Sequence, residues 1–280
     1  MSDTTRAAQD RLSVEQRTDA ARGSDVVRQA VVAVSAVVAV VGSAIGSGAF
    51  GGTPIAEAGG GALSAEATLV APDGPAFAIW SLIYLGLVAY AVHQALPAQR
   101  TARRHRATGW LAAASLVLNA VWILVAQAGY VALSAGIIAV LLAVLVAVVV
   151  RLARDPERNR VDGTLTDGTF GLYTGWVSIA TVANVAAALK DAGVTEGVLG
   201  AETWAVFLAA VAAGIGTLMA SVTRGSLGYG GALTWGLAWI AVGRTSGPDT
   251  AGTVVVAAGL SAVIVLAATL LARSRRPVVV

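Results

Sequence analysis

The sequence contains no cysteine, and only two of its 280 residues are histidines, His93 and His105. The lack of cysteine excludes disulfides, thiolate nucleophiles and thiolate metal sites. Both histidines fall at or beyond one end of a long hydrophobic run, so imidazole ligation of haem iron inside that run is not expected. The sequence therefore predicts no metal site and no required cofactor.

Charged residues are scarce as well: 12% of the chain is charged and 56% is hydrophobic, with a mean hydropathy of +0.75. Acidic residues occur near the N-terminus, in predicted loops or at the edges of hydrophobic runs. Ion-coupled carriers usually keep ionisable groups at mid-membrane depth. Because the runs also lack carboxylate pairs and nucleophile–histidine arrangements, an enzyme is the less favoured interpretation.

The chain is rich in long apolar runs, and these predict an all-α, polytopic membrane helix bundle. A membrane-spanning helix needs about 20 mostly apolar residues. The chain offers about eight such runs, of which the seventh is short and rich in glycine. The runs are 27–49, 76–96, 108–127, 131–150, 168–189, 203–223, 227–243 and 252–272.

The basic residues predict how the bundle is oriented. With eight spans and a cytoplasmic N-terminus, 17 of the 19 basic residues lie on the cytoplasmic side, and only Lys190 and Arg244 lie outside. This bias follows the positive-inside rule and places both termini in the cytoplasm of a cell with an inner membrane of bacterial type. The net charge of +3 thus reflects membrane orientation, and no nucleic-acid partner is expected. Residues 1–25, which mix arginines with acidic residues, are predicted to form a disordered cytoplasmic arm.

Three of the runs carry aromatic and amide side chains at helical spacing, so each set shares one helix face. An amide that faces lipid without a partner costs a few kcal/mol, so Asn119 and Asn184 should point into the bundle. The three faces converge beneath the long 51–75 connection, which we interpret as a lid. The sets are Phe77, Trp80 and Tyr84; Ser115, Asn119 and Trp122; and Tyr173, Trp176, Ala180 and Asn184.

The segments "IWSLIY", "LNAVW" and "YTGWVSIATVAN" occur in this order along the chain. Together they resemble the TspO/MBR family, the translocator proteins or tryptophan-rich sensory proteins, over about residues 26–190. The resemblance implies a five-helix core with a cavity closed by the first loop. Residues 191–280 would then form an extension of about three further membrane helices.

The resemblance also implies that the cavity binds flat hydrophobic molecules such as porphyrins and other tetrapyrroles. Indole rings stack on planar π-systems, and an amide can hydrogen-bond a propionate or carbonyl group. Carried over by position, with Tyr173 added because it shares the face of Trp176, the candidate ligand-binding residues are Trp80, Tyr84, Asn119, Trp122, Tyr173, Trp176, Ala180 and Asn184. The alternative is that the tryptophans anchor the membrane interface and the asparagines join helices.

Three functions fit these observations. The favoured one is a membrane receptor or carrier for porphyrin-like ligands, acting in tetrapyrrole homeostasis or stress sensing. The others are a membrane enzyme that degrades porphyrin, and a transporter or scaffold whose specific role lies in the last three helices. The partners expected are the lipid bilayer and a hydrophobic small molecule. The "GSAIG" segment, with Gly42 and Gly46, also permits close helix contact in a homodimer.

Overall fold

The computed structural model describes residues 22–46, 57–155, 159–194, 197–247 and 249–275, and within these ranges its regular structure is entirely helical. The predicted all-α membrane bundle is therefore confirmed. Most of the predicted disordered arm, residues 1–21, lies outside the described residues, whereas Gly23 and Asp25 already belong to the first helix.

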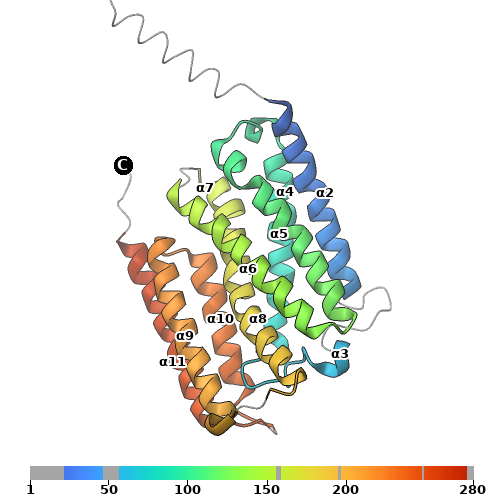
Figure 1. Ribbon diagram of the computed structural model, residues 1–280. Coiled ribbons are helices and arrows are strands. Elements are labelled where there is room, and N and C mark those ends of the chain that lie inside the picture. Colours follow the sequence, from blue (N-terminus) through green and yellow to red (C-terminus); the bar gives the residue numbers. More distant parts are fainter. Residues whose placement is uncertain (1–21, 47–56, 156–158, 195–196, 248, 276–280) are drawn as a thin grey trace, which may run out of the picture.

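Eight long helices form the bundle, and short helical segments connect some of them (Figure 1). The long helices are α2 (Gly23–Gly46), α4 (Ile79–Ala95), α5 (Arg103–Gln127), α6 (Val131–Arg154), α8 (Thr169–Asp191), α9 (Gly200–Val222), α10 (Leu227–Gly243) and α11 (Gly252–Ser274). The short segments are α3 (Ala58–Gly61), η1 (Gly74–Ala78), η2 (Pro97–Gln99), α7 (Arg160–Asp162), the π-helical η3 (Gly163–Gly168) and η4 (Gly197–Leu199).

Within the described residues, seven helices are long and apolar enough to cross a membrane, so the predicted count of eight was wrong. The exception is α10, which matches the predicted seventh run but has only 17 residues. At 1.5 Å per residue it is about 26 Å long, shorter than the roughly 30 Å hydrocarbon core. The fifth span is longer than predicted, because α7 and η3 continue directly into α8 and extend it from Arg160 to Asp191.

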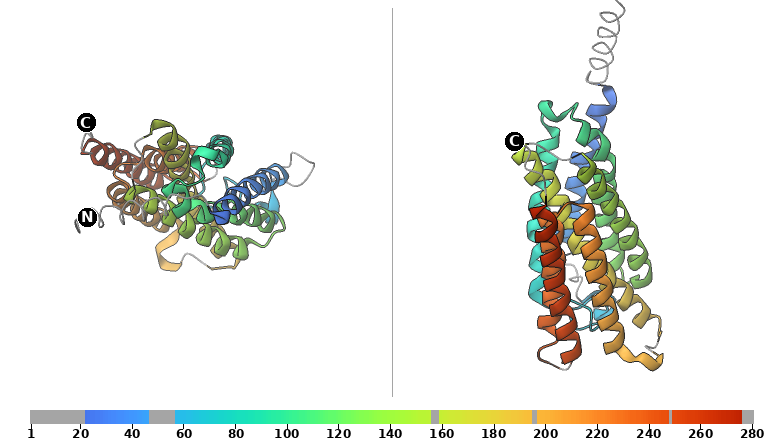
Figure 2. Two further views of the ribbon diagram at one scale, coloured as in Figure 1. Left: turned by 90° about the horizontal axis from the view of Figure 1, so that it is seen from above. Right: turned by 90° about the vertical axis from the view of Figure 1, so that its left-hand side faces the viewer.

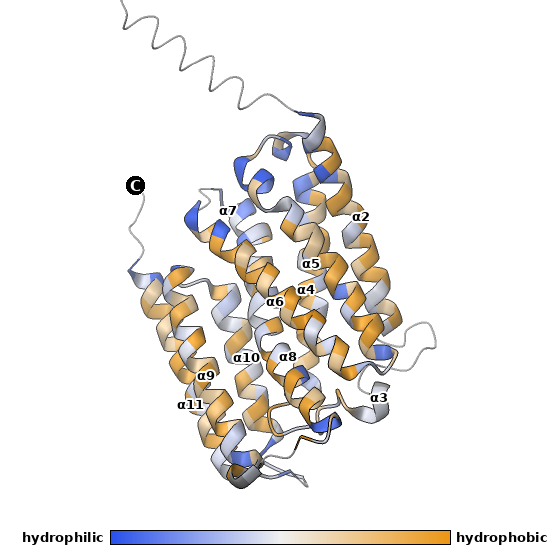
Figure 3. Cartoon of the chain, in the orientation of Figure 1, coloured by the Kyte–Doolittle hydropathy of each residue, from blue (hydrophilic) through white to orange (hydrophobic). Residues whose placement is uncertain are grey.

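The helices run roughly parallel to one common axis (Figure 2), and hydrophilic residues gather toward the two ends of the bundle (Figure 3). Helix α2 begins and α11 ends at the same end, which we call the terminal end (Figure 1). The opposite end holds α3 and is called the lid end. Helix α5 packs against α2 and α6, α6 against α8, and α8 against α10, which in turn packs against α11.

Glycines bring α8 and α10 into close contact. A methyl group at Gly175 would lie 2.3 Å from the carbonyl oxygen of Tyr229, and one at Gly171 would lie 2.7 Å from Ser226 Oγ. Small residues of this kind let two helix backbones approach each other within a membrane. The last three helices therefore join the first five through the interface of α10 with α8.

The glycines of "GSAIG" serve a similar purpose within the chain. Gly42 faces Ala120, and Gly46 faces Ile123, both on α5. A methyl group at Gly46 would lie 2.2 Å from the Ile123 side chain. This glycine face is covered by the same chain, so it gives no support to the predicted homodimer.

Candidate ligand cavity

A cavity of about 530 Å³ lies at the lid end of the bundle, enclosed by α2, α4, α5, α8 and the segment before η1. Its volume is in the range typical of small-molecule sites. The described residues that line it include no acidic residue, histidine, lysine or arginine. They are Ser43, Gly46, Ala62, Leu63, Ser64, Ala65, Ala67, Thr68, Ala71, Pro72, Gly74, Phe77, Trp80, Ser81, Tyr84, Trp122, Ile123, Trp176, Ala180, Ala183 and Asn184.

The structure brings most of the predicted ligand-binding residues to this cavity. Those in its wall are Trp80, Tyr84, Trp122, Trp176, Ala180 and Asn184. Asn119 and Tyr173 are fully buried beside the cavity and are not among the described lining residues. Both interact with residues of the wall. Asn119 accepts a hydrogen bond from Tyr84, and the ring centroid of Tyr173 lies 6.1 Å from that of Trp80.

Trp80 is the centre of an aromatic cluster that forms one side of the cavity. Its ring is stacked near Tyr84 and Trp122, with centroid distances of 5.5 and 6.1 Å. Trp176 meets it edge-on at 6.3 Å and meets Phe77 edge-on at 5.6 Å. Stacked and edge-to-face geometries are the favourable ones for aromatic pairs, so the cluster holds its indole rings in fixed orientations.

Hydrogen bonds fix the two asparagines. Asn184 Oδ1 accepts from Trp122 Nε1 and from Ser134 Oγ, both at 3.3 Å, and its amide nitrogen donates to the carbonyl of Ala180 at 3.0 Å. Asn119 Oδ1 accepts from the Tyr84 hydroxyl at 2.6 Å. These bonds join α4 to α5 and both α5 and α6 to α8. The asparagines therefore serve helix packing, as the alternative interpretation expects, while Asn184 also lines the cavity.

Two buried donors at this site have no hydrogen-bond partner within the described residues: Trp176 Nε1 and Asn119 Nδ2. Trp176 is 1% exposed, and its side chain lines the cavity. Most buried N–H groups in folded proteins find an acceptor, because an unpaired one costs about 1–3 kcal/mol. An acceptor group on a bound molecule would satisfy the indole of Trp176.

The connection that covers the cavity is described from residue 57 onward, and we call residues 57–73 the lid. The lid end of α10, together with Arg244 directly after it, holds the lid in place. Arg244, which is 2% exposed, donates to the carbonyls of Ala65 and Ala71 at 2.9 and 3.4 Å. The backbone nitrogen of Asp73 donates to the carbonyl of Trp239 at 3.3 Å.

Two further hydrogen bonds hold the lid and the short helix η1 that follows it. Lys190 Nζ donates to the carbonyl of Ala67 at 2.7 Å, and Trp235 Nε1 donates to the carbonyl of Ala76 at 3.0 Å. Residues 51–56 of the predicted lid lie outside the described residues. From residue 62 on, the lid supplies part of the cavity wall.

A second hollow, of about 970 Å³, lies between the lid, α8, α9 and residues 249–251. Aliphatic side chains such as Val185 and Leu208 form much of its wall, and Glu66, Lys190 and Glu202 border it. It contains none of the predicted ligand-binding residues.

Comparison with known proteins places these features in a family. A model of the TSPO-like protein family matches residues 30–271. The chain belongs to the TSPO-like protein family. The match continues to α11, beyond residue 190 where the sequence resemblance was judged to end, so it includes the three helices treated as an extension. No curated protein and no solved structure matches the chain.

Several cavity residues of this TSPO-like chain did not appear among the predicted site residues. Phe77 shares a helix face with Trp80, so the spacing that identified Trp80 also pointed to it. Ser43 comes from α2, which carries no aromatic motif, and nothing in the sequence marked it. The lid contacts of Lys190 and Arg244 were also missed, although the charge pattern had singled out these two residues as the basic groups on the far side of the membrane.

Proposed function

We propose that this TSPO-like membrane protein is a receptor or carrier that binds flat hydrophobic ligands of the porphyrin type in the cavity beneath the lid. The observation that carries the proposal is the set of three indole rings, Trp80, Trp122 and Trp176, around a partly open cavity whose described lining residues carry no formal charge. Indole faces stack on planar π-systems, and an apolar wall with few polar groups is typical of ligand sites.

The unpaired indole N–H of Trp176 supports a ligand with a carboxylate or carbonyl group at its edge. Such a donor would orient the ligand in addition to contributing to affinity. We favour reversible binding over catalysis, because the described lining residues include no carboxylate or imidazole that could serve as a general acid or base. The hydroxyl of Tyr84, which does line the cavity, already donates its hydrogen to Asn119. On this proposal the ligand enters and leaves unchanged, in the service of tetrapyrrole homeostasis or stress sensing.

The proposal includes an orientation: the terminal end faces the cytoplasm of a cell with a bacterial-type inner membrane, and the cavity opens toward the outer side. The arginines of the α4–α5 connection, at the terminal end, support it through the positive-inside rule. Because the chain has no cysteine, single introduced cysteines can test it. Ser246→Cys should react with a membrane-impermeant maleimide in intact cells, and Arg103→Cys only after permeabilisation; the reverse pattern would contradict the orientation.

Binding of protoporphyrin IX to the purified protein, followed through the porphyrin's own fluorescence, tests the ligand assignment. Trp176→Phe keeps an aromatic ring but removes the indole N–H. A hydrogen bond to a charged group is worth about 1.5–3 kcal/mol, so this change should weaken binding roughly tenfold or more.

The matched control is Trp110→Phe, because Trp110 lies on α5 with half of its surface exposed and does not line the cavity. This variant should bind as the wild type does. Binding that never saturates, or that both variants weaken equally, would rule out the proposed site.

A further inference from the structure

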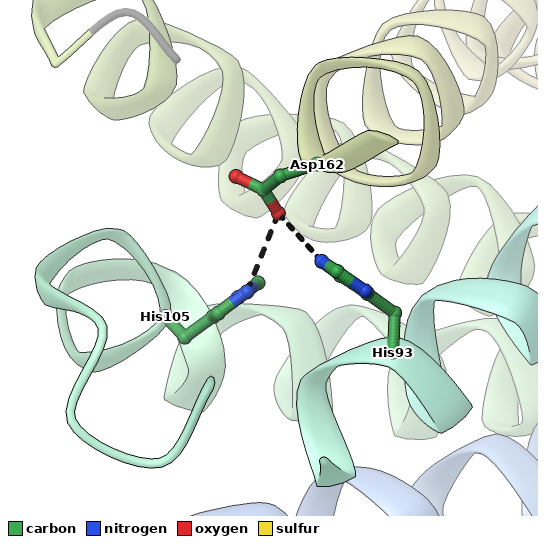
Figure 4. A group of neighbouring side chains, drawn as sticks. All are labelled: His93, His105 and Asp162. Carbon is green, nitrogen blue, oxygen red and sulfur yellow. Dashed lines mark hydrogen bonds and ion pairs between the residues drawn. The ribbon is translucent and has the colours of Figure 1, made fainter. Parts of the chain in front are cut away.

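A second group of side chains with the chemistry of a binding site lies at the terminal end, far from the cavity. It combines His93, near the end of α4, His105, in the first turn of α5, and Asp162, at the end of α7. These residues are 7%, 1% and 4% exposed. Figure 4 shows both imidazole rings directed toward the carboxylate of Asp162.

The distances within this group fit a metal site. Asp162 Oδ1 lies 3.2 Å from His93 Nε2 and 3.3 Å from His105 Nε2. Two ligands bound to one tetrahedral zinc ion at 2.0–2.1 Å are about 3.3 Å apart. One ligand atom from each residue can be chosen so that all three lie within 4.8 Å of one another. A small inward movement of the imidazoles would bring all three atoms around one ion.

His105 supplies an independent observation. Neither of its ring nitrogens forms a hydrogen bond with any described residue, although the side chain is almost completely buried. Its Nε2 is near Asp162 Oδ1, but the alignment of a hydrogen bond is missing. This geometry is expected when His105 Nε2 points at a metal ion that it shares with Asp162, and not at the Asp162 carboxylate itself. A buried polar atom without a partner requires an explanation of this kind.

The surroundings hold the carboxylate in place. Thr166 Oγ1 donates to Asp162 Oδ1 at 2.6 Å, and Arg104 Nε lies 3.3 Å from Oδ2. Arg104 also pairs with Asp167. Outer partners that orient a ligating carboxylate are a regular part of metal sites.

We propose that His93, His105 and Asp162 bind a divalent transition-metal ion of the zinc type. Imidazole and carboxylate ligands suit zinc and its neighbours in the first transition row, and the chain has no thiolate to compete. Three protein ligands leave the fourth tetrahedral position to a water molecule. The ion would join α4, α5 and α7 at the end of the bundle opposite the lid. This site is independent of the proposed ligand cavity.

The test uses the full-length protein carrying an affinity tag without histidine, so that the two histidines of the chain are the only imidazoles present. After treatment with a chelator, the protein is titrated with Co²⁺ and then with Zn²⁺. We expect one Co²⁺ ion per chain with the intense visible absorption of a tetrahedral site, displaced by one equivalent of Zn²⁺. Zn²⁺ should also raise the unfolding temperature.

Two ligand variants, His105→Asn and Asp162→Asn, should each lose more affinity than the 10–100-fold that loss of an outer partner costs. The matched control is Asp155→Asn, which removes a carboxylate at the same end of the bundle that pairs with the exposed Arg103. It should bind as the wild type does. The Co²⁺ spectrum and the number of ions bound by the wild-type protein test the proposal by themselves. The test therefore still works if a variant fails to fold. Absence of stoichiometric binding to the wild type, or equal loss in Asp155→Asn, would overturn the proposal.

Discussion

At the scale of single residues, the buried amides show how one side chain can serve both helix packing and a cavity. Asn184 lines the cavity and joins α8 to α5 and α6 through Trp122 and Ser134. Asn119 is fully buried and accepts from Tyr84, which lines the cavity. Cavity lining and helix packing are therefore combined in the side chain of Asn184.

Replacement of Tyr84 by phenylalanine tests the part that Asn119 has in helix packing. The change leaves Oδ1 of the fully buried Asn119 without its hydroxyl donor. Because hydrogen bonds between membrane helices contribute about 1 kcal/mol, the free energy of unfolding should fall by about that amount. Denaturant unfolding in detergent, followed by circular dichroism, would measure it. Tyr130→Phe is the control, since Tyr130 is 64% exposed and should tolerate the change; an equal loss in both variants would contradict the assignment.

Sequence reasoning reached the tryptophans and asparagines because residues three or four apart on a helix share a face. It could not join Asp162 to the two histidines, since their proximity depends on how α4, α5 and α7 meet. No spacing rule connects residues on different helices. The prediction of no metal site came from considering the histidines alone, and the proposed zinc-type site stands against it.

At the scale of the elements, hydrophobic runs predicted the position of every long helix, because a spanning segment cannot be much shorter than the bilayer core. The ends were less predictable. The fifth span begins with polar residues, so its hydrophobic run did not predict that the helix extends through α7 and η3. Helix α10 had the predicted bounds and still fell short of a spanning length, as its 17 residues required.

Arg244, the residue directly after α10, anchors the lid, and this anchor can be tested. Arg244→Gln shortens the side chain and removes the charged donor to the carbonyls of Ala65 and Ala71. Because hydrogen bonds from charged groups are worth about 1.5–3 kcal/mol, the lid should open more readily, and protoporphyrin IX should dissociate roughly tenfold faster. Stopped-flow displacement measures this rate.

The control for the lid experiment is Asp249→Asn. Asp249 is partly exposed and forms an ion pair with Arg244 at 3.5 Å, but its carboxylate has no hydrogen to donate to the lid carbonyls. Its removal should change the rate little. If both variants release the ligand at the wild-type rate, the bonds from Arg244 do not hold the lid closed.

At the scale of the whole molecule, the two ends of the bundle differ in chemistry. The terminal end carries His93, His105 and Asp162 with their arginine partner, whereas the lid end carries the uncharged cavity. Helices α2, α4, α5 and α8 form the cavity wall together with the lid, and α10 with the adjoining Arg244 holds the lid from the side of the last three helices. The TSPO-like family model matches through residue 271 and so includes helices on both sides of residue 190.

We propose that the cavity beneath the lid, and not the second hollow, binds a flat hydrophobic ligand. Both spaces are bordered by α8, and one residue of that helix can fill each. Ala180 lines the cavity, and Val185 lines the second hollow. The decisive measurement is equilibrium binding of protoporphyrin IX to Ala180→Phe and Val185→Phe, with folding checked by circular dichroism. We predict that Ala180→Phe abolishes saturable binding while Val185→Phe binds as the wild type does; unchanged binding by a folded Ala180→Phe would contradict the account.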